Sequence, residues 1–250
     1  MSDYPKISII TVCFNADKFI GDNIISVNNQ DYANIEHIFV DGSSNDNTVS
    51  IIKNMVRTNH TLISEPDMGI YNAMNKGIGL ASGEYVIFLN SDDMFSDHNT
   101  ITKYVETINQ NSADIVFSDI LFIKRSSKDN IIRTWKAGNF SKRKLKFGWM
   151  PPHPGVLVKS EIFRKFGCFD EKFKISGDYD FLLRVFSNYE GKIVYLNTVS
   201  VIMRYGGISS RSYKNTFRKW KEDLIAIKQN NIGSILTVFF KRIIKLNQIL

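Results

Sequence analysis

The fold of this chain is decided by the stretch Tyr85-Val86-Ile87-Phe88-Leu89-Asn90-Ser91-Asp92-Asp93. Its first five residues are aromatic, β-branched or aliphatic, which predicts a buried strand. Two adjacent carboxylates, Asp92 and Asp93, follow the carboxyl end of that strand. Ligands of open α/β sheets bind just beyond such strand ends. A divalent cation that also holds a diphosphate would suit these carboxylates, although Asn90 to Asp93 also have the composition of a plain polar turn.

The bulk composition is that of a globular protein with one sizeable α/β domain or two small ones. The 250 residues are 43% hydrophobic and 23% charged, which argues against a disordered chain. Cys13 and Cys168 are too few for a disulfide framework, which indicates a reducing compartment. The first six residues contain no apolar segment of a secretory signal, and no apolar run reaches the ~18 residues of a membrane-spanning helix. We therefore expect a cytoplasmic protein.

The net charge of +7 lies in residues 211–250. This segment contains nine Lys or Arg against two acids, Glu222 and Asp223, whereas residues 1–210 are neutral. Nucleic-acid binding spread over the fold is therefore not expected. A tail of this charge favours contact with an anionic surface.

Residues 7–93 alternate between strand-like and helix-like segments. Strands are predicted at 7–12, 35–40, 61–64 and 85–89, and helices at 19–27, 49–56 and 70–81. Asp46 or Asn47 is expected to cap the second helix. This order predicts a mostly parallel, Rossmann-like α/β sheet with helices on both faces.

Residues 94–210 have a less regular pattern. It predicts helices at 101–108, 161–166 and 179–186, short strands at 115–117, 120–123, 131–135, 194–196 and 199–204, and a Lys-rich loop at 142–146. No Pro/Gly-rich linker and no internal repeat separates the two halves. We therefore expect one domain, residues 1–210, with halves at 1–95 and 96–210, followed by a helical tail at 211–250.

Polar clusters follow four of the predicted strands: Thr11–Asn15, Asp41–Ser44, Glu65–Asp67 and Asp92–Asp93. Asp41 could accept a hydrogen bond from a nucleoside base or ribose, and Lys76 on the next helix could reach a phosphate. Taken singly, Asp41 fits a helix-entry turn and Lys76 a solvated surface lysine. Four polar strand ends on one rim indicate a binding site.

In these segments the chain resembles the family 2 nucleotide-sugar glycosyltransferases of the GT-A fold. The matching segments are 9–15, 40–48, 64–77, 81–85, 89–93, 167–171 and 176–184, within a resemblance that covers residues 5–210. The last two segments are similar to the family's acceptor half. The resemblance therefore implies a nucleotide-binding half at 1–95 and an acceptor half at 96–210.

The resemblance also implies roles for single positions. Asp92 and Asp93 match the family's Asp-x-Asp-type element, in which one carboxylate reaches the ribose and the other binds Mn²⁺ or Mg²⁺ at the diphosphate. The expected metal ligand is Asp93, with Asp92 as the alternative. Val40 stands where many members have another Asp before Asp41, so contacts to the base would depend on one carboxylate. Asn90 replaces the first Asp of the metal motif, so weaker metal binding is expected. The base and ribose would be bound by Thr11, Asn15, Asp41 and Asp67, with Lys76 nearby.

Asp178 matches the position of the family's catalytic base, although Gly177 replaces the acid that often precedes it. An inverting transfer needs a carboxylate that takes the proton of the acceptor hydroxyl on the face opposite the leaving diphosphate. Asp180 is the alternative base, and a capping role at a helix N-terminus is the alternative for Asp178.

Two further positions complete the predicted site. His153, between two prolines, matches an acceptor or diphosphate contact, although a lone His is more often structural. Arg204 opens the segment Arg204–Ser210, which is either a flap that neutralises phosphate or a glycine turn into the tail.

The implied activity is that of a metal-dependent inverting hexosyltransferase. The donor would be a nucleotide sugar, most simply a UDP-sugar, and the acceptor a lipid-linked oligosaccharide of bacterial O-antigen or capsule synthesis. In the tail, aromatic and aliphatic residues interleaved with Lys and Arg predict an interfacial helix on the cytoplasmic face of the inner membrane. Packing on the domain, or on a second subunit of a homodimer, is the alternative.

Two other functions remain open. A sugar nucleotidyltransferase would use the same carboxylates but usually has a Gly-rich loop after its first strand, whereas Cys13–Ala16 contains no glycine. A catalytically silent nucleotide-binding scaffold would keep the fold without the chemistry.

Overall fold

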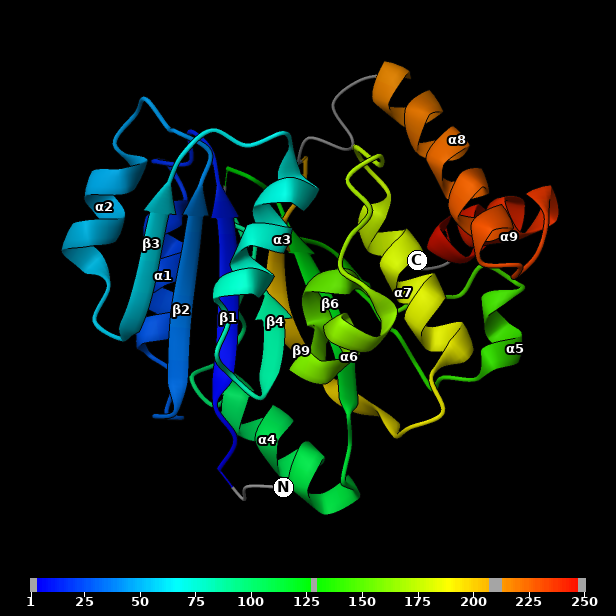
Figure 1. Ribbon diagram of the computed structural model, residues 1–250, viewed down its shortest axis with the longest axis horizontal. Helices are drawn as coiled ribbons and strands as arrows, with labels where there is room; N and C mark the ends of the chain where they lie inside the picture. The colour runs from blue at the N-terminus through cyan, green and yellow to red at the C-terminus, as the bar shows by residue number, and fades with distance from the viewer. Residues whose placement is uncertain (1–3, 127–129, 207–212, 247–250) are drawn as a thin grey trace.

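The computed structural model describes residues 4–126, 130–206 and 213–246. Its first half alternates between strands and helices as the sequence predicts (Figure 1). Of the two predicted caps of the second helix, Asn47 occupies the N-cap position but makes no side-chain cap bond, whereas Asp46 Oδ1 accepts the backbone N–H of Thr48 at 2.9 Å. The elements of this half are β1 (Ile7–Cys13), α1 (Ile20–Asn28), β2 (Ile35–Asp41), α2 (Thr48–Met55), β3 (Asn59–Ser64), α3 (Ile70–Leu80) and β4 (Tyr85–Phe88).

The second half mixes short strands with helices and ends in two tail helices. Its elements are β5 (Met94–Phe95), α4 (Thr100–Asn111), β6 (Ile115–Ile123), β7 (Ile131–Trp135), α5 (Lys142–Leu145), the 3₁₀ turn η1 (His153–Gly155), β8 (Val156–Lys159), α6 (Ser160–Phe166), α7 (Gly177–Asn188), β9 (Ile193–Arg204), α8 (Tyr213–Gln229) and α9 (Ile235–Leu246).

Within the described residues, nine strands form one sheet. Its order is β3-β2-β1-β4-β8-β6-β9-β5, with β7 paired to β6. β3, β2, β1 and β4 are parallel, so their carboxyl ends meet at one edge. β8 runs antiparallel to β4 and β6, whereas β6 and β9 are parallel. The predicted α/β class, with a mostly parallel sheet in residues 1–95, is confirmed.

Helices cover both faces of the sheet, as alternation along each strand requires. In β1, Ile10 and Val12 face one apolar core with α3, α6 and α7, which lie in front of the sheet in Figure 1. Ile7 and Ile9 face a second core with α1 and α4. The tail helices belong to the first core, since Ala226, Ile227 and Val238 are buried in it.

Three sequence predictions were wrong in detail. Residues 115–117 and 120–123 form one strand, as do 194–196 and 199–204, because the two strands pair through a register shift near Ser118 and Asp119. The polar residues there resembled a strand break, but the hydroxyl of Tyr104 lies 2.8 Å from both Ser118 Oγ and Ser200 Oγ and satisfies them. The Lys-rich loop contains a short helix, α5.

Glu36 ties together the amino ends of three strands. Its carboxylate is buried and accepts hydrogen bonds from Ser8, from both the backbone and the hydroxyl of Ser82, and from the backbone of Gly83. The ammonium of Lys6 lies 2.6 Å away. Burial opposes ionisation of Glu36, but these hydrogen bonds outweigh it and lower its pKa to about 2.

We expect Glu36→Gln to lower the free energy of unfolding at pH 7 by about 2 kcal/mol, the size of a hydrogen bond to a charged group. Because folding lowers this pKa from 4.5 to about 2, the stabilisation is present above pH 4.5 and is lost as the pH falls towards 2. Denaturant unfolding at a series of pH values measures both effects. Glu106→Gln, an exposed change on α4, is the control. Equal stability of Glu36→Gln and wild type at pH 7 would contradict this account.

Candidate active site

A cavity of ≈ 1400 Å³ opens at the carboxyl ends of β1, β2 and β4 and extends to α7 and the tail helices. Both halves of the chain and the tail contribute to its wall. Six of the residues predicted from sequence line it: Asn15, Asp67, Asp92, His153, Asp178 and Arg204. The structure therefore brings the predicted nucleotide side and the predicted acceptor side into one space.

Hydrogen bonds from α1 hold the backbone of the turn after β4 in place. The amide nitrogen of Asn23, a fully buried residue, donates to the carbonyl groups of Asn90 at 2.9 Å and Asp93 at 3.2 Å. The hydroxyl of Thr11 donates to the carbonyl of Leu89 at 2.8 Å. Thr11 is itself fully buried, so it holds the turn rather than lining the cavity.

The two carboxylates of this turn have different environments. Asp93 is buried, outside the cavity wall, and its Oδ2 accepts the amide N–H of Asn90 at 2.9 Å. Burial, with the charge of Asp92 added to it, raises the pKa of Asp93 well above its usual value. Asp92 is the carboxylate that lines the cavity. Its position, unlike that of Asp93, favours direct contact with a ligand.

Two arginines flank Asp92. The guanidinium of Arg125 donates to Asp92 Oδ2 at 2.8 Å, and that of Arg204 donates to the Asp92 carbonyl at 2.7 Å. Arg204 also pairs with Asp22 of α1. Both guanidinium groups lie over the ring of Phe19, at 4.3 Å for Arg125 and 4.8 Å for Arg204. Such planar donors match phosphate oxygens, so this end of the cavity is suited to an anion.

The residues at this turn fit a hard divalent cation. Asp92 presents a partly exposed carboxylate to the cavity beside Asn90 and Ser91, whose side chains also offer oxygen atoms. Among the residues that the structure describes, no cluster of three or more His, Cys, Asp or Glu could hold a metal alone. A cation here would need ligands from a diphosphate and water, the usual arrangement for Mg²⁺ with nucleotides.

Besides Thr11, two residues predicted to bind nucleoside lie outside the cavity wall. Asp41 is fully buried and accepts hydrogen bonds from Ser44 and Ser64, so its carboxylate organises the rim. Lys76 pairs with Glu65 at 2.7 Å and donates to the carbonyl of Pro66. Their direct contact with a nucleotide remains a prediction. Asn15 and Asp67 do line the cavity.

Asp178 lies in the first turn of α7, and the N-cap of this helix is Ser176, so the alternative role of Asp178 as the capping residue is wrong. Its Oδ1 lies 3.1 Å from the hydroxyl of Tyr71 on α3, which also donates to the carbonyl of Ile175 at 2.7 Å. His153 lines the same cavity and stacks on Phe88 of β4. Burial lowers the pKa of His153, and the negative charge of Asp178 opposes that shift. His153 is therefore a neutral imidazole near pH 7.

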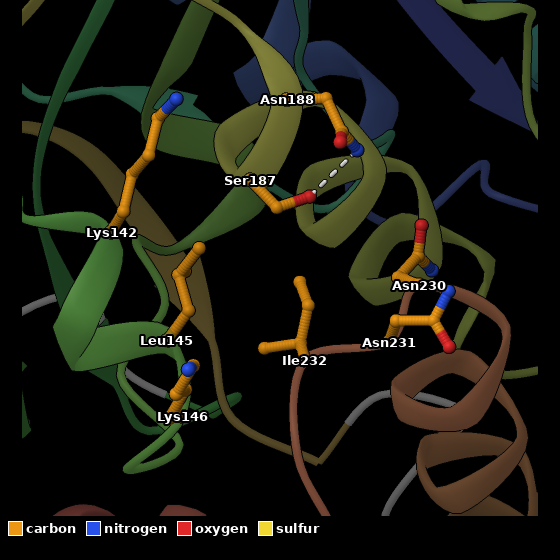
Figure 2. A pocket seen from close by; sticks show the side chains of 8 residues that line it. All are labelled: Lys142, Leu145, Lys146, Ser187, Asn188, Asn230, Asn231 and Ile232. Carbon is orange, nitrogen blue, oxygen red and sulfur yellow. Dashed lines mark hydrogen bonds between the residues drawn. The ribbon is translucent and has the colours of Figure 1, made fainter.

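Asp180, the alternative base, does not line this cavity. It is buried and paired with Arg184 at 3.3 Å, and it accepts the amide N–H of Asn230 at 2.9 Å. Asn230 lines a smaller pocket of ≈ 330 Å³ with residues of α5 and the carboxyl end of α7, among them Lys142 and Ser187 (Figure 2). These contacts fit a structural role for Asp180, which joins α7 to the end of α8.

Sequence reasoning missed three residues that shape the site. Asn23 could have been noticed as a polar residue on the buried face of α1, between Ile20 and Ile24. Tyr71 and Arg125 gave no such signal, because each acts on a residue far along the chain. Of the predicted flap Arg204–Ser210, residues 207–210 lie outside the described residues.

The sequence of this chain matches the model of Glycosyl transferase family 2 over residues 8–167. The chain belongs to this family. An uncharacterised glycosyltransferase of Mycobacterium tuberculosis is 33% identical over 186 residues, which are 74% of this chain and 70% of that protein. A PGL/p-HBAD biosynthesis glycosyltransferase of Mycobacterium bovis is 28% identical over 221 residues, which are 86% of this chain and 83% of that protein.

Solved structures show the same fold. S. aureus TarS 1-349 in complex with UDP-GlcNAc superimposes with a TM-score of 0.67 at 18% identity, over 89% of this chain and 66% of that one. The chain thus spans slightly less than two thirds of that TarS structure. Mannosyltransferase PcManGT from Pyrobaculum calidifontis, in complex with GDP-Man and Mn²⁺, superimposes with a TM-score of 0.66 at 17% identity, over 98% and 69%.

Gly177 gives a test of the contact between Tyr71 and Asp178. A Cβ at residue 177 would lie 2.8–2.9 Å from three carbon atoms of the Tyr71 ring, so the ring would have to move. We expect Gly177→Ala to lower kcat for glycosyl transfer by roughly tenfold or more, with the donor KM unchanged. Steady-state kinetics measure both. Gly79→Ala on α3, where a Cβ meets nothing within 4 Å, is the matched control. Equal turnover by the two variants would contradict the proposed packing.

Proposed function

We propose that this protein is an inverting glycosyltransferase that moves a hexose from a UDP-sugar to a lipid-linked saccharide. Mn²⁺ or Mg²⁺ would be held at Asp92, and Asp178 would be the general base. One observation carries the proposal. Asp92 at the end of β4 and Asp178 at the start of α7 line the same cavity, and that cavity is large enough for a nucleotide sugar and an acceptor.

The donor would lie across the carboxyl ends of the parallel strands. Phe14, Asn15 and Asp67 line the part of the cavity next to β1 and β3, where the uridine would bind. The diphosphate would reach Asp92, beside the guanidinium groups of Arg125 and Arg204. Among the solved structures of this fold, TarS is in complex with UDP-GlcNAc and PcManGT with GDP-Man, so a nucleotide-sugar donor suits the fold whichever base it carries.

The acceptor hydroxyl would approach the sugar from the side of α7. Asp178 would take the proton of this hydroxyl as the new bond forms. His153, neutral at pH 7, would orient the acceptor or the diphosphate by a hydrogen bond. When bound, a divalent cation would neutralise the charge that grows on the departing diphosphate. The acceptor oxygen would bond to the anomeric carbon on the face opposite the departing diphosphate as the bond to the diphosphate breaks, and this single displacement would give a product of inverted configuration.

Replacing each Asp by Asn keeps the size of the side chain and removes its charge, so such variants separate the roles of the two carboxylates. We expect Asp92→Asn to raise the donor KM at least tenfold and to abolish stimulation by Mn²⁺, because one ligand oxygen and its charge are lost. We expect Asp178→Asn to bind UDP within twofold of wild type and to lower kcat at least a hundredfold, because no base remains. UDP release from a panel of UDP- and GDP-sugars, with and without Mn²⁺, measures turnover, and calorimetry with UDP measures binding.

Asp31→Asn, an exposed change before β2, is the control for these variants. Normal turnover by both Asp92→Asn and Asp178→Asn would refute the proposed function. Consumption of a nucleoside triphosphate with release of pyrophosphate would show a nucleotidyltransferase instead. Absence of UDP binding by wild type would leave the scaffold alternative.

The surface of the tail helices supports a membrane-bound acceptor. No helix in the described part of the chain is long and apolar enough to cross a membrane. Basic side chains lie over exposed aromatic ones, Lys221 over Phe217 at 4.7 Å and Arg242 over Trp220 at 3.5 Å. This combination suits anionic lipid headgroups and the upper acyl region. We define the tail patch as the exposed residues Phe217, Trp220, Ile225, Ile235, Leu236, Phe239, Phe240 and Ile243.

We expect the double variant Leu236→Gln, Phe239→Gln to lose at least tenfold in affinity for vesicles containing phosphatidylglycerol, since two exposed apolar side chains of the tail patch are removed. Wild-type binding should weaken as salt is added and on neutral vesicles. Vesicle sedimentation measures these affinities. Leu80→Gln, Ile131→Gln, at exposed positions on α3 and β7, is the control. Unchanged vesicle binding, with a change from dimer to monomer in light scattering, would identify the patch as a subunit interface.

A further inference from the structure

Glu222 of α8 fills an anion-binding loop directly before α7. Its buried carboxylate accepts three consecutive backbone N–H groups, from Lys174 at 3.1 Å, Ile175 at 2.8 Å and Ser176 at 2.9 Å. Successive N–H groups that converge in this way form a nest for an anion. Here the anion is a side chain of the tail, 46 residues from Ser176 along the chain.

This loop leads directly to Asp178. Ser176 is the N-cap residue of α7, and Asp178 lies in its first turn. Ile175 is held from both sides, since its N–H donates to Glu222 and its carbonyl accepts the hydroxyl of Tyr71. The same hydroxyl lies 3.1 Å from Asp178 Oδ1. Polar contacts thus run from Glu222 through the loop to Tyr71, whose single hydroxyl hydrogen is shared between the Ile175 carbonyl and the Asp178 carboxylate.

The neighbouring tail residues hold the same turn from the cavity side. The ammonium of Lys241 on α9 lies 2.9 Å from Asp223 and 3.1 Å from the ring centroid of Tyr179, which follows Asp178. Burial lowers the pKa of Lys241 to about 8, against the opposing effect of Asp223. Lys241 and Asp223 also line the cavity. The tail therefore packs on the first turn of α7 with several polar contacts rather than through apolar contact alone.

We propose that Glu222 is a positioning residue for glycosyl transfer. By filling the nest at residues 174–176, it fixes the first turn of α7 and keeps the Asp178 carboxylate aimed into the cavity. The inference rests on the proposed role of Asp178 as base. It makes the tail helices part of the catalytic apparatus, so that their removal or displacement would stop transfer without removing the donor site.

Two variants of Glu222 test this role. Glu222→Gln keeps the shape of the side chain, but its amide N–H₂ group is a hydrogen-bond donor that faces the backbone N–H donors of residues 174–176. We expect kcat for UDP release from the UDP-sugar that wild type uses to fall at least tenfold, with the donor KM and the affinity for UDP within twofold. In Glu222→Ala the nest is emptied, and we expect added sodium formate to restore kcat at least severalfold, whereas sodium chloride does not.

Glu106→Gln on α4 is the matched control for charge and is expected to behave as wild type. Unchanged kcat in Glu222→Gln would overturn the proposal. A parallel loss of kcat and UDP affinity, or failure of formate to restore kcat in Glu222→Ala, would do so too, because a merely structural residue would give these results. Asp178→Asn separates this inference from the proposed function. If Asp178→Asn is inactive while Glu222→Gln is active, only the positioning role fails, whereas turnover by Asp178→Asn refutes the proposed base.

Discussion

The candidate site depends on the hydrogen bonds that the side-chain amide group of Asn23 donates to the turn after β4. This amide group is fully buried, and its nitrogen faces the carbonyl groups of Leu89, Asn90 and Asp93 at 2.9–3.4 Å. An apolar side chain there would remove one donor from each carbonyl group, which is costly. The Asp93 carbonyl would be affected most, because Leu89 also accepts from Thr11 and Asn90 from the N–H of Asp93. Because these hydrogen bonds fix the turn, the carboxylate of Asp93 is directed into the core and that of Asp92 into the cavity.

Most of residues 1–95 could be predicted, because continuous apolar runs mark strands that are buried on both faces, and helices between them indicate parallel pairing. The side-chain roles were harder to predict. Asp92 and Asp93 are adjacent and chemically identical, and contacts made in the folded chain distinguish them: Arg125 pairs with the Asp92 carboxylate, whereas Asn23 donates to the Asp93 carbonyl. Asp41 has a carboxylate at a strand end, as a ligand-binding residue would, yet this carboxylate accepts hydrogen bonds from Ser44 and Ser64 at the same edge of the sheet.

The acceptor half depends on contacts that sequence patterns do not contain. Tyr71 acts on Asp178, 107 residues away, and Gly177 leaves the space that the Tyr71 ring occupies. In the tail, the interleaved apolar and basic residues predicted an interfacial helix; Trp220, Leu236 and Phe239 are exposed, whereas Ile227 and Val238 are buried against the domain. The sequence pattern gave no indication that Glu222 and Lys241 are buried, because such residues are usually solvated. A tail helix can therefore contact the candidate site with its buried residues and, as we propose, the membrane with its exposed residues.

The most direct test of the account is a crystal structure of the protein with UDP and Mn²⁺. The account predicts the uracil beside Asn15 and Asp67, the diphosphate between Arg125 and Arg204, and the ion bonded to the Asp92 carboxylate at about 2.1 Å, near the ideal for a small hard cation. Asp93 should stay buried and make no bond to the ion. Asp178 should face the terminal phosphate of UDP, where the sugar is attached in the donor. Nucleotide bound elsewhere, or an ion held by Asp93 with Asp92 still paired to Arg125, would contradict it.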